Sequence, residues 1–226
     1  MLDLFKKDEW CDTLEMAVAK VDASDNEKKT TFEMESLTEC PRRLTYKISG
    51  YDYDNSGAWI KKKHQEAIRD KWIAILSKSK EVRVIKKRSL IGDVSSNIAG
   101  ILDAFIEIDN IHFCVKIKAI DSNDFDLIKE KGPFRTHVIE LMVCMWLAEV
   151  EDGILVYEDN SSQLFQVFHS KLYEPFIKSI TAKCKKLMEY QVRSKLPPIP
   201  ADYKKRDARE CLKCEFINTC KKITNG

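Results

Sequence analysis

Hydrophobic positions follow a helical period near both ends of the chain and a strand period in its middle. In residues 57–78, Ile60, His64, Ile68, Trp72 and Leu76 fall at every fourth position. This spacing predicts an amphipathic helix with His64 in its apolar stripe.

The middle of the chain alternates with the two-residue period of strands. Residues 81–86, 100–109 and 111–120 show it, and Asn110 separates the last two. In residues 111–120, Cys114, Lys116 and Lys118 share the face opposite Phe113, Val115 and Ile117. We therefore expect a hairpin turning at Asn110, and a second strand pair over 153–158 and 163–169.

Further helices are predicted on either side of these strands. Residues 3–20 have helical spacing, and 33–46 look helical on either side of the Cys40–Pro41 step. Residues 136–149 are almost continuously apolar, which is typical of a buried helix, and 171–192 form a helix with a basic face. The order predicts a single α/β domain over 1–226 with a mixed sheet.

Composition narrows the function classes. The chain has 226 residues, with 38 Lys+Arg against 36 Asp+Glu and a net charge of +2. Any nucleic-acid surface must therefore be local, not global. No apolar run approaches the roughly 20 residues that span a bilayer, and residues 1–12 lack a secretory signal. We expect a soluble, cytoplasmic protein without a membrane partner.

The placement of the 8 cysteines carries the strongest chemical signal. Cytosolic cysteines are more often thiols or metal ligands than disulfides. Cys211, Cys214 and Cys220 form Cys-x2-Cys-x5-Cys, which supplies three thiolates to one centre, and a fourth ligand must come from elsewhere. Spacing alone leaves zinc and an iron–sulfur cluster open. The remaining cysteines (Cys11, Cys114, Cys144 and Cys184) fit core positions.

A wider pattern joins this tail to the N-terminal part of the chain. Cys40 within Glu-Cys-Pro-Arg-Arg precedes Pro-Pro-x-Pro at 197–200 and the cysteine tail. Over residues 36–222 the chain resembles the RecB-like exonucleases of CRISPR loci and phages. The resemblance implies a PD-(D/E)XK fold and a 4Fe-4S cluster held by Cys40, Cys211, Cys214 and Cys220. It also implies that 36–50 and 197–224 join as a cluster-bearing cap.

The same resemblance marks a catalytic centre that departs from the family pattern. The family binds Mg²⁺ or Mn²⁺ with carboxylates and a histidine, and a lysine stabilises negative charge. Gly100-Ile-Leu-Asp103 matches the first motif, His64 the histidine and Lys118 the lysine. Lys116, however, stands where the family has a metal-binding acid. Glu140 and Cys144 occupy the positions of a Gln-x3-Tyr motif.

The departures suggest a charge swap. An ammonium about 4 Å from a divalent ion costs on the order of 4 kcal/mol per unit charge at an effective dielectric of about 20. We expect Lys116 to project beside Asp103 and Lys118 and to form a salt bridge with Glu140 or Asp103. Three departures in one pocket favour natural divergence over a single engineered substitution.

Two function hypotheses follow. One is a non-catalytic descendant that binds DNA or a protein partner and keeps the cluster as a structural staple; Lys116 favours this one. The other is a metal-dependent exonuclease on single-stranded DNA using His64, Asp103, Lys118 and Glu140. Local basic clusters, including Arg42 and Arg43, predict single-stranded DNA contacts.

Overall fold

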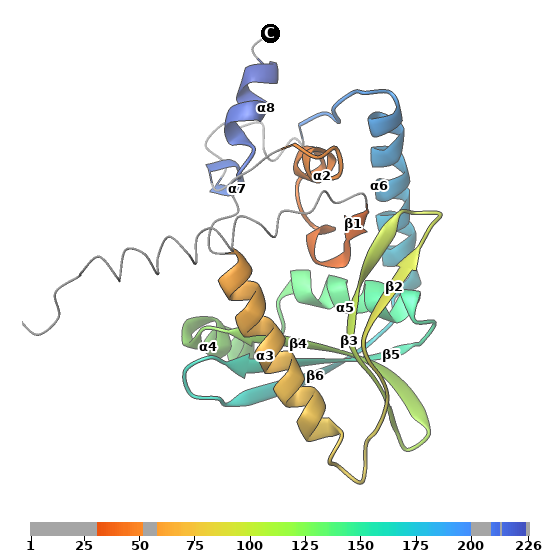
Figure 1. Ribbon diagram of the computed structural model, residues 1–226, viewed down its shortest axis with the longest axis vertical. Coiled ribbons are helices and arrows are strands. Elements are labelled where there is room, and N and C mark those ends of the chain that lie inside the picture. Colours follow the sequence, from red (N-terminus) through yellow and green to blue (C-terminus); the bar gives the residue numbers. More distant parts are fainter. Residues whose placement is uncertain (1–30, 52–57, 200–208, 213, 225–226) are drawn as a thin grey trace, which may run out of the picture.

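The fold is an α/β architecture built around one mixed sheet (Figure 1). The computed structural model describes residues 31–51, 58–199, 209–212 and 214–224. The elements in chain order are β1 (Phe32–Glu33), η1 (Met34–Ser36), α2 (Pro41–Ile48), α3 (Ala58–Leu76), β2 (Arg83–Asp93), β3 (Ile98–Ile108), β4 (Ile111–Ile120), α4 (Ser122–Lys131), α5 (Arg135–Leu147), β5 (Asp152–Asp159), β6 (Phe165–Lys171), α6 (Glu174–Val192), α7 (Arg209–Leu212) and α8 (Ile217–Thr224).

The predicted α/β class with a mixed sheet is confirmed. Within the described residues the sheet has six strands in the order β1-β3-β4-β5-β6, and β2 pairs with β3 as well. The β4–β5 and β1–β3 pairs are parallel, whereas β2–β3, β3–β4 and β5–β6 are antiparallel. The predicted helix over 3–20 lies outside the described residues.

The hairpin between β3 and β4 turns where the sequence predicted it. Asp109 and Asn110 have φ values of 50° and 65°, and Ile108 pairs with Ile111 across them. Left-handed conformations at both central residues match the twist of a two-residue hairpin turn, and Asn and Asp tolerate them best.

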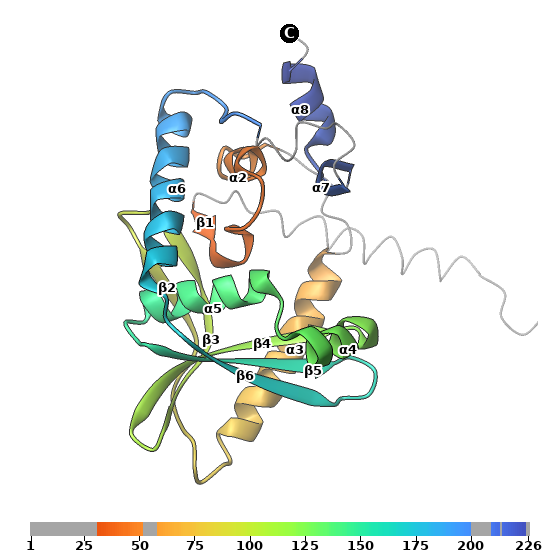
Figure 2. The same ribbon diagram turned by 180° about the vertical axis from the view of Figure 1, so that it is seen from behind.

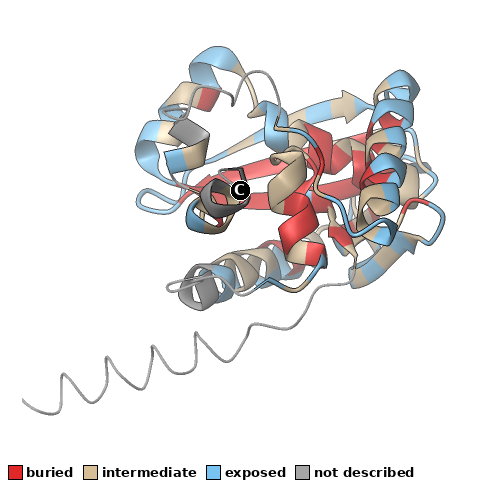
Figure 3. Ribbon diagram, turned by 90° about the horizontal axis from the view of Figure 1, so that it is seen from above, coloured by how far each residue is buried: buried red, intermediate tan, exposed pale blue. Residues whose placement is uncertain are grey.

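Helices cover both faces of the sheet, as two opposite views show (Figures 1 and 2). On one face, Trp72 and Ile73 of α3 pack against Ile106, Val115 and Ile117. On the other face α5 and α6 build the larger core cluster. Seen from above, buried residues concentrate in the middle of the fold, with exposed residues around them (Figure 3). In α5, six residues are buried: Ile139, Glu140, Leu141, Val143, Cys144 and Met145. Because α5 is buried nearly all round, its polar side chains, Glu140 above all, need partners inside the core.

β3 is forked along one edge. Ile98 pairs with both Asp93 of β2 and Phe32 of β1, so β1 and β2 lie on opposite edges of β3. β4 shares the β1 edge, but it pairs with β3 only over Ala104–Ile108. The stretch 100–103 between these two pairings faces neither strand. This gap beside residues 100–103, where β1 and β4 diverge, is called the fork below, and the candidate site lies in it.

Gly100 allows η1 to approach the fork. A Cβ at Gly100 would lie 2.2 Å from Met34 Cε and 2.6 Å from Met34 Cγ, and Met34 is buried. A larger residue would push η1 outward, and with it Glu35.

α4 was not predicted, although its signals are present in the sequence. Asp121 Oδ1 accepts from the Asp124 backbone N–H at 2.9 Å and caps the helix, which ends before Gly132. Phe125 and Ile128 provide a short apolar stripe that is buried in the core.

Candidate functional site

Side chains satisfy the backbone of β4 where it leaves β3. Asp103 Oδ2 accepts from the Ile117 N–H at 2.8 Å. Gln65 of α3 bonds Ala119 on both sides: its Nε2 donates to the Ala119 carbonyl at 2.7 Å, and its Oε1 accepts from the Ala119 N–H at 3.2 Å. The fork is thus held open by polar side chains where a neighbouring strand would otherwise pair.

Lys116 fills the fork. Its side chain is 0% exposed, and its Nζ donates to the Ile101 carbonyl at 3.0 Å. The same Nζ lies 2.8 Å from Glu140 Oε1, 3.6 Å from Asp103 Oδ1 and 3.8 Å from Glu35 Oε1. The prediction that Lys116 projects beside Asp103 and meets a buried carboxylate is confirmed.

Glu140 joins both lysines of the second strand motif. Lys118 Nζ lies 2.5 Å from Glu140 Oε2, and its side chain reaches the surface more than that of Lys116. Burial alone would raise the pKa of Glu140, but the charges of Lys116 and Lys118 lower it to about 2. Burial would likewise lower the pKa of Lys116, yet Asp103, Glu140 and Glu35 hold it above its ordinary value. Lys116 and Glu140 are therefore both ionised near neutral pH.

Two residues of the pocket were missed by the sequence analysis. Arg69 Nε of α3 lies 3.3 Å from Asp103 Oδ1, and Glu35 arrives from η1. Three cations (Lys116, Lys118 and Arg69) thus face three carboxylates. Arg69 follows directly after Ile68 of the apolar stripe, so its position along the helix was only a weak sign of an inward side chain. The place of Glu35 in the pocket depends on the long-range pairing of β1 with β3, which the sequence pattern does not show.

His64 is not part of this pocket. Its side chain is exposed on α3, and its Nε2 lies 2.9 Å from Asn160 Oδ1 in the loop after β5. The expectation that it belongs to the inward apolar stripe is wrong. Residues four apart are displaced by about 40° around a helix, so His64 stands about 80° away from Trp72. Gln65 takes the inward place instead.

His137 is a further titratable group near the pocket that the sequence analysis did not single out. It lies one turn before Glu140 on α5, and its Nδ1 is 2.9 Å from the Tyr157 hydroxyl, which accepts from the Phe134 N–H at 3.1 Å. Burial and then the charge of Lys118 lower the pKa of His137 to about 4. The imidazole is therefore neutral at physiological pH.

A divalent metal does not fit between Asp103 and Glu140 while Lys116 is present. The ammonium already lies within 4 Å of both carboxylates, and Lys118 takes the second Glu140 oxygen. A divalent ion there would have to displace a fixed positive charge that is buried and hydrogen-bonded. The donor set therefore suits a lysine–carboxylate network.

The cysteines predicted as ligands lie in the segment formed by α2, α7 and α8, called the cap below. Cys40 precedes α2, and the Cys214 N–H donates to the Cys211 carbonyl at 3.2 Å in the turn after α7. Burial raises the pKa of the Cys214 thiol, and the neighbouring Cys40 sulfur adds to this effect. Cys220 lies on α8 and is half-buried like the others.

Long-range contacts tie the two halves of the cap together. Arg43 Nη2 lies 2.8 Å from Glu215 Oε2, and the Tyr46 ring packs against Phe216 with centroids 5.2 Å apart. Lys183 of α6 donates to the carbonyls of Leu37 and Glu39 at 2.7 and 3.1 Å, which fixes the loop before Cys40.

Arg42 and Arg43 have intramolecular partners in the cap. Arg42 bonds the Pro197 carbonyl and the Cys220 sulfur, and Arg43 bonds Glu39 and Glu215. Both guanidinium groups are therefore occupied in holding the cap together. The predicted contacts of these arginines with DNA stay a prediction.

The cysteine donors suit a thiolate-bound centre in their chemistry. Three come from one short segment and Cys40 from the facing one, which is what a four-thiolate centre joining two chain segments requires. Within the part of the chain that the structure describes, no three Cys, His, Asp or Glu side chains already stand in a metal-ligand arrangement. Cys114, Cys144 and Cys184 are fully buried, as expected for core residues, and Cys11 lies outside the described residues.

Comparison with solved structures identifies the fold. The chain is similar to the alkaline exonuclease LHK-Exo from Laribacter hongkongensis, with a TM-score of 0.57 at 10% identity over 77% of this chain and 93% of that one. A phage-related exonuclease from Haemophilus somnus 129PT gives a TM-score of 0.51 at 10% identity, over 73% and 94% of the two chains. The chain shares the fold of these two structures.

SSO0001 matches over nearly the whole chain, with a TM-score of 0.52 at 19% identity over 96% of this chain and 98% of that one. No family model and no curated protein matches the sequence. At these identities the similarity establishes the fold of the chain and not its activity. Any activity has to be argued from the side chains of the fork.

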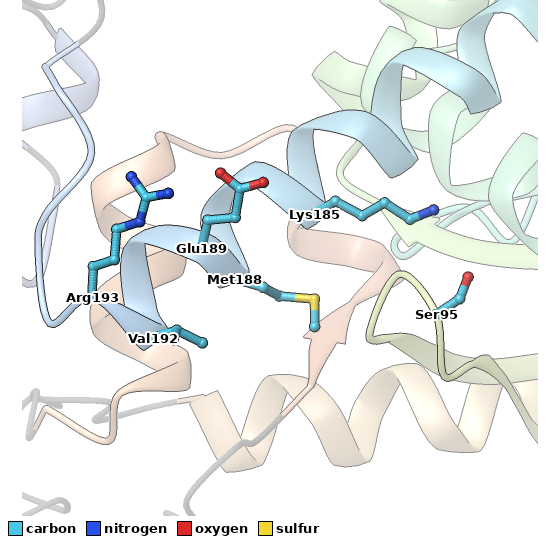
Figure 4. A pocket seen from close by; sticks show the side chains of 6 residues that line it. All are labelled: Ser95, Lys185, Met188, Glu189, Val192 and Arg193. Atoms are coloured by element: carbon cyan, nitrogen blue, oxygen red, sulfur yellow. The ribbon is translucent and has the colours of Figure 1, made fainter.

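A separate hollow of about 360 Å³ lies between α6 and the turn after β2 (Figure 4). Its lining combines Met188 and Val192 with Lys185, Glu189 and Arg193, while Ser95 comes from the turn. None of its lining residues belongs to the fork or the cap cysteines, so it lies apart from both candidate sites. Among the helices that the structure describes, none is long and apolar enough to cross a membrane.

Proposed function

We propose that this protein binds single-stranded DNA on an exonuclease fold without cleaving it. One observation carries the proposal: the buried Lys116 ammonium lies 2.8 Å from Glu140 and 3.6 Å from Asp103. The ammonium neutralises the two carboxylates that would otherwise attract a divalent ion. Without such an ion the site lacks the Lewis acid that polarises a phosphodiester in metal-dependent nucleases.

The charged side chains of the fork have a structural role and provide local charge. Lys116 supports both carboxylates and the Ile101 carbonyl, and so fixes the opening between β3 and β4. Lys118, nearer the surface, and Arg69 add positive charge at its mouth. Asp103, Glu140 and Glu35 balance this charge, so a phosphate backbone would be attracted mainly by basic side chains outside the fork.

A nucleic-acid ligand is supported by the fold comparison. LHK-Exo has been crystallised in complex with dAMP, and that structure matches this chain with a TM-score of 0.55 at 11% identity over 73% of this chain and 89% of that one. Basic side chains of β2 lie across β3 from the fork: Lys87 pairs with Ala104, next to Asp103, and Lys86 with Phe105. We therefore assign the DNA strand to this side of the sheet.

The second part of the proposal is a 4Fe-4S cluster in the cap, held by Cys40, Cys211, Cys214 and Cys220. Four thiolates suit this cluster, and zinc is the alternative that the same donors accept. The cluster supplies a covalent tie between segments that are otherwise joined by ion pairs and ring packing. Its role is structural, because the cap residues stand apart from the charged network of the fork.

The competing function is a metal-dependent exonuclease acting on single-stranded DNA, with Mg²⁺ or Mn²⁺ held by Asp103 and Glu140. The shared fold with exonucleases favours it. It requires Lys116 to leave the fork, and it loses the histidine ligand because His64 bonds Asn160. A further role as a scaffold for a protein partner in a DNA-processing or phage or CRISPR complex fits the same fold.

The deciding experiment incubates the protein with end-labelled single-stranded DNA in Mg²⁺ or Mn²⁺, beside Lys116→Glu and Lys116→Gln. We expect no cleavage by the wild type. Lys116→Glu should gain metal binding, seen as thermal stabilisation by Mn²⁺ of about 2.7 kcal/mol at a hundred times the dissociation constant. Lys116→Gln, which lacks the new carboxylate, is the matched control and should gain much less. Metal-dependent cleavage by the unaltered protein would overturn the proposal.

A further inference from the structure

Arg42 links the C-terminal thiol of the cap to the chain that leads into it. Its Nε donates to the Pro197 carbonyl at 2.8 Å, and its Nη1 donates to Cys220 Sγ at 3.5 Å. The partners are 155 and 178 residues away in sequence, so the two bonds bring together both segments of the cap. An N–H···S bond from a guanidinium is charge-assisted and places a positively charged group beside the sulfur.

Tyr46 reaches the same sulfur from the next turn of α2. Its hydroxyl is buried and has no hydrogen-bond partner of ordinary geometry, while the Cys220 sulfur is its neighbour. The ring is fixed between Tyr51, at 5.0 Å between centroids, and Phe216, at 5.2 Å. A buried hydroxyl held in this way is costly unless it finds an acceptor, and a metal-bound thiolate is a better acceptor than a thiol.

Arg43 provides the contrast. It is the neighbour of Arg42 on α2, yet its guanidinium bonds the carboxylates of Glu39 and Glu215. Arg43 therefore braces the cap through carboxylates, and its charge acts on the nearby Cys214 thiol without a hydrogen bond to it. Arg42 thus hydrogen-bonds a sulfur, whereas Arg43 hydrogen-bonds carboxylates.

We propose that Arg42 and Tyr46 are positioning residues for the Cys220 ligand and that they raise the reduction potential of the cap centre. This inference rests on the proposed 4Fe-4S cluster. Hydrogen bonds to ligand sulfur and a nearby positive charge favour the reduced form of a cluster, which carries one more negative charge. Arg42 also fixes Pro197, and so holds the chain segment that leads toward the ligand tail.

The test compares the wild type with Arg42→Gln, Arg42→Lys, Tyr46→Phe and the matched control Arg43→Gln, all isolated without oxygen. Iron and sulfide per chain establish whether the cluster is present, and a potentiometric titration gives its reduction potential. We expect Arg42→Gln and Tyr46→Phe to move the potential to more negative values. Arg42→Lys, which keeps the charge, should recover part of the shift. Arg43→Gln should loosen the cap toward proteases and shift the potential less than Arg42→Gln, because Arg43 acts on Cys214 through its charge alone and donates no hydrogen bond to that sulfur.

The outcomes separate the two proposals. A wild type that holds the cluster while Arg42→Gln and Tyr46→Phe leave its potential unchanged overturns the role of these residues and leaves the cluster standing. Co²⁺, whose thiolate ligation is visible by absorbance, is the second probe. A wild type that binds neither iron nor Co²⁺ through these cysteines overturns the proposed centre and the Arg42 role together. If Arg42→Gln fails to fold, Tyr46→Phe decides, because it removes only a hydroxyl.

Discussion

Lys116 Nζ lies 2.8 Å from Glu140 Oε1, and both side chains are almost wholly removed from water. Buried ion pairs of this kind contribute little net stability, because desolvation offsets their attraction, but breaking one leaves a costly buried charge. The pair therefore fixes the structure of the fork, because substitution of either residue alone would leave the other charge buried without its partner.

Lys116→Ala should be strongly destabilising. Asp103 and Glu140 would remain buried beside each other with only Lys118 and Arg69 as cations. We expect a loss of about 3–5 kcal/mol in the free energy of unfolding, measured by urea denaturation at pH 7.

Lys129→Ala is the control for this experiment. Lys129 pairs with Asp126 at 3.0 Å, but both side chains are exposed, so its loss should cost less than about 1 kcal/mol. The double variant Lys116→Met with Glu140→Gln should recover part of the Lys116→Ala loss. A Lys116→Ala protein as stable as the wild type would contradict the buried network.

Acid should destabilise the protein in two steps. His137 has a pKa lowered to about 4, so between its unfolded value of about 6.5 and pH 4 the unfolded chain binds more protons and stability falls as pH falls. Glu140 has a pKa lowered to about 2, so its contribution is complete above about 4.3 and is lost between there and pH 2. Urea denaturation at intervals from pH 8 to pH 2 measures both steps.

The His137→Gln variant separates the two steps. It should flatten the stability curve between pH 6.5 and 4 by on the order of 3 kcal/mol and leave the loss below pH 4 in place. An unchanged slope in the upper range would show that other groups, not His137, take up those protons.

The residues of β4 and α5 made the charge network predictable from the sequence. The two-residue period of 111–120 places Lys116 and Lys118 on one face, and the continuous apolar run around Glu140 marks that helix as buried. A buried carboxylate requires a cation, and the lysines of the neighbouring strand were the available ones.

The remaining parts of the pocket depend on tertiary pairing that local patterns do not encode. Glu35 reaches the fork because β1 pairs in parallel with β3, more than sixty residues further along the chain. The exact rotation of α3, which brings in Gln65 and Arg69 and turns His64 out, is set by how Trp72 and Ile73 pack on the sheet. A row of every fourth residue fixes a helix face only to within about 40° per step.

Iron content should depend on the ligand cysteines and not on the core ones. We expect Cys214→Ser to abolish the iron of anaerobically isolated protein and to make the cap more sensitive to proteases, since the cluster would no longer join its two segments. Cys184→Ala is the control, because Cys184 is fully buried in α6 and contributes to the core. Equal iron in both variants would place the metal elsewhere.

Binding to single-stranded DNA should depend on the basic edge of β2. Lys86 and Lys87 are exposed there, across β3 from the fork, whereas Arg42 and Arg43 are engaged in the cap. Because each phosphate contact on a single strand contributes about 0.7 to the slope of log affinity against log salt, Lys86→Ala with Lys87→Ala should lower that slope by about 1 and weaken binding at low salt.

Lys171 on β6 supplies a control for the same titration. It is also exposed, although it pairs with Asp152 at 3.2 Å, and β6 lies at the far edge of the sheet, four strand spacings or about 19 Å from β2. Lys171→Ala should therefore change neither the affinity nor the slope. If both variants weakened binding equally, attraction would come from the overall charge, and the assignment of the strand to the β2 side would fail. If neither weakened it, the phosphate contacts would have to lie on other basic residues, with Lys118 and Arg69 of the fork mouth the next to change.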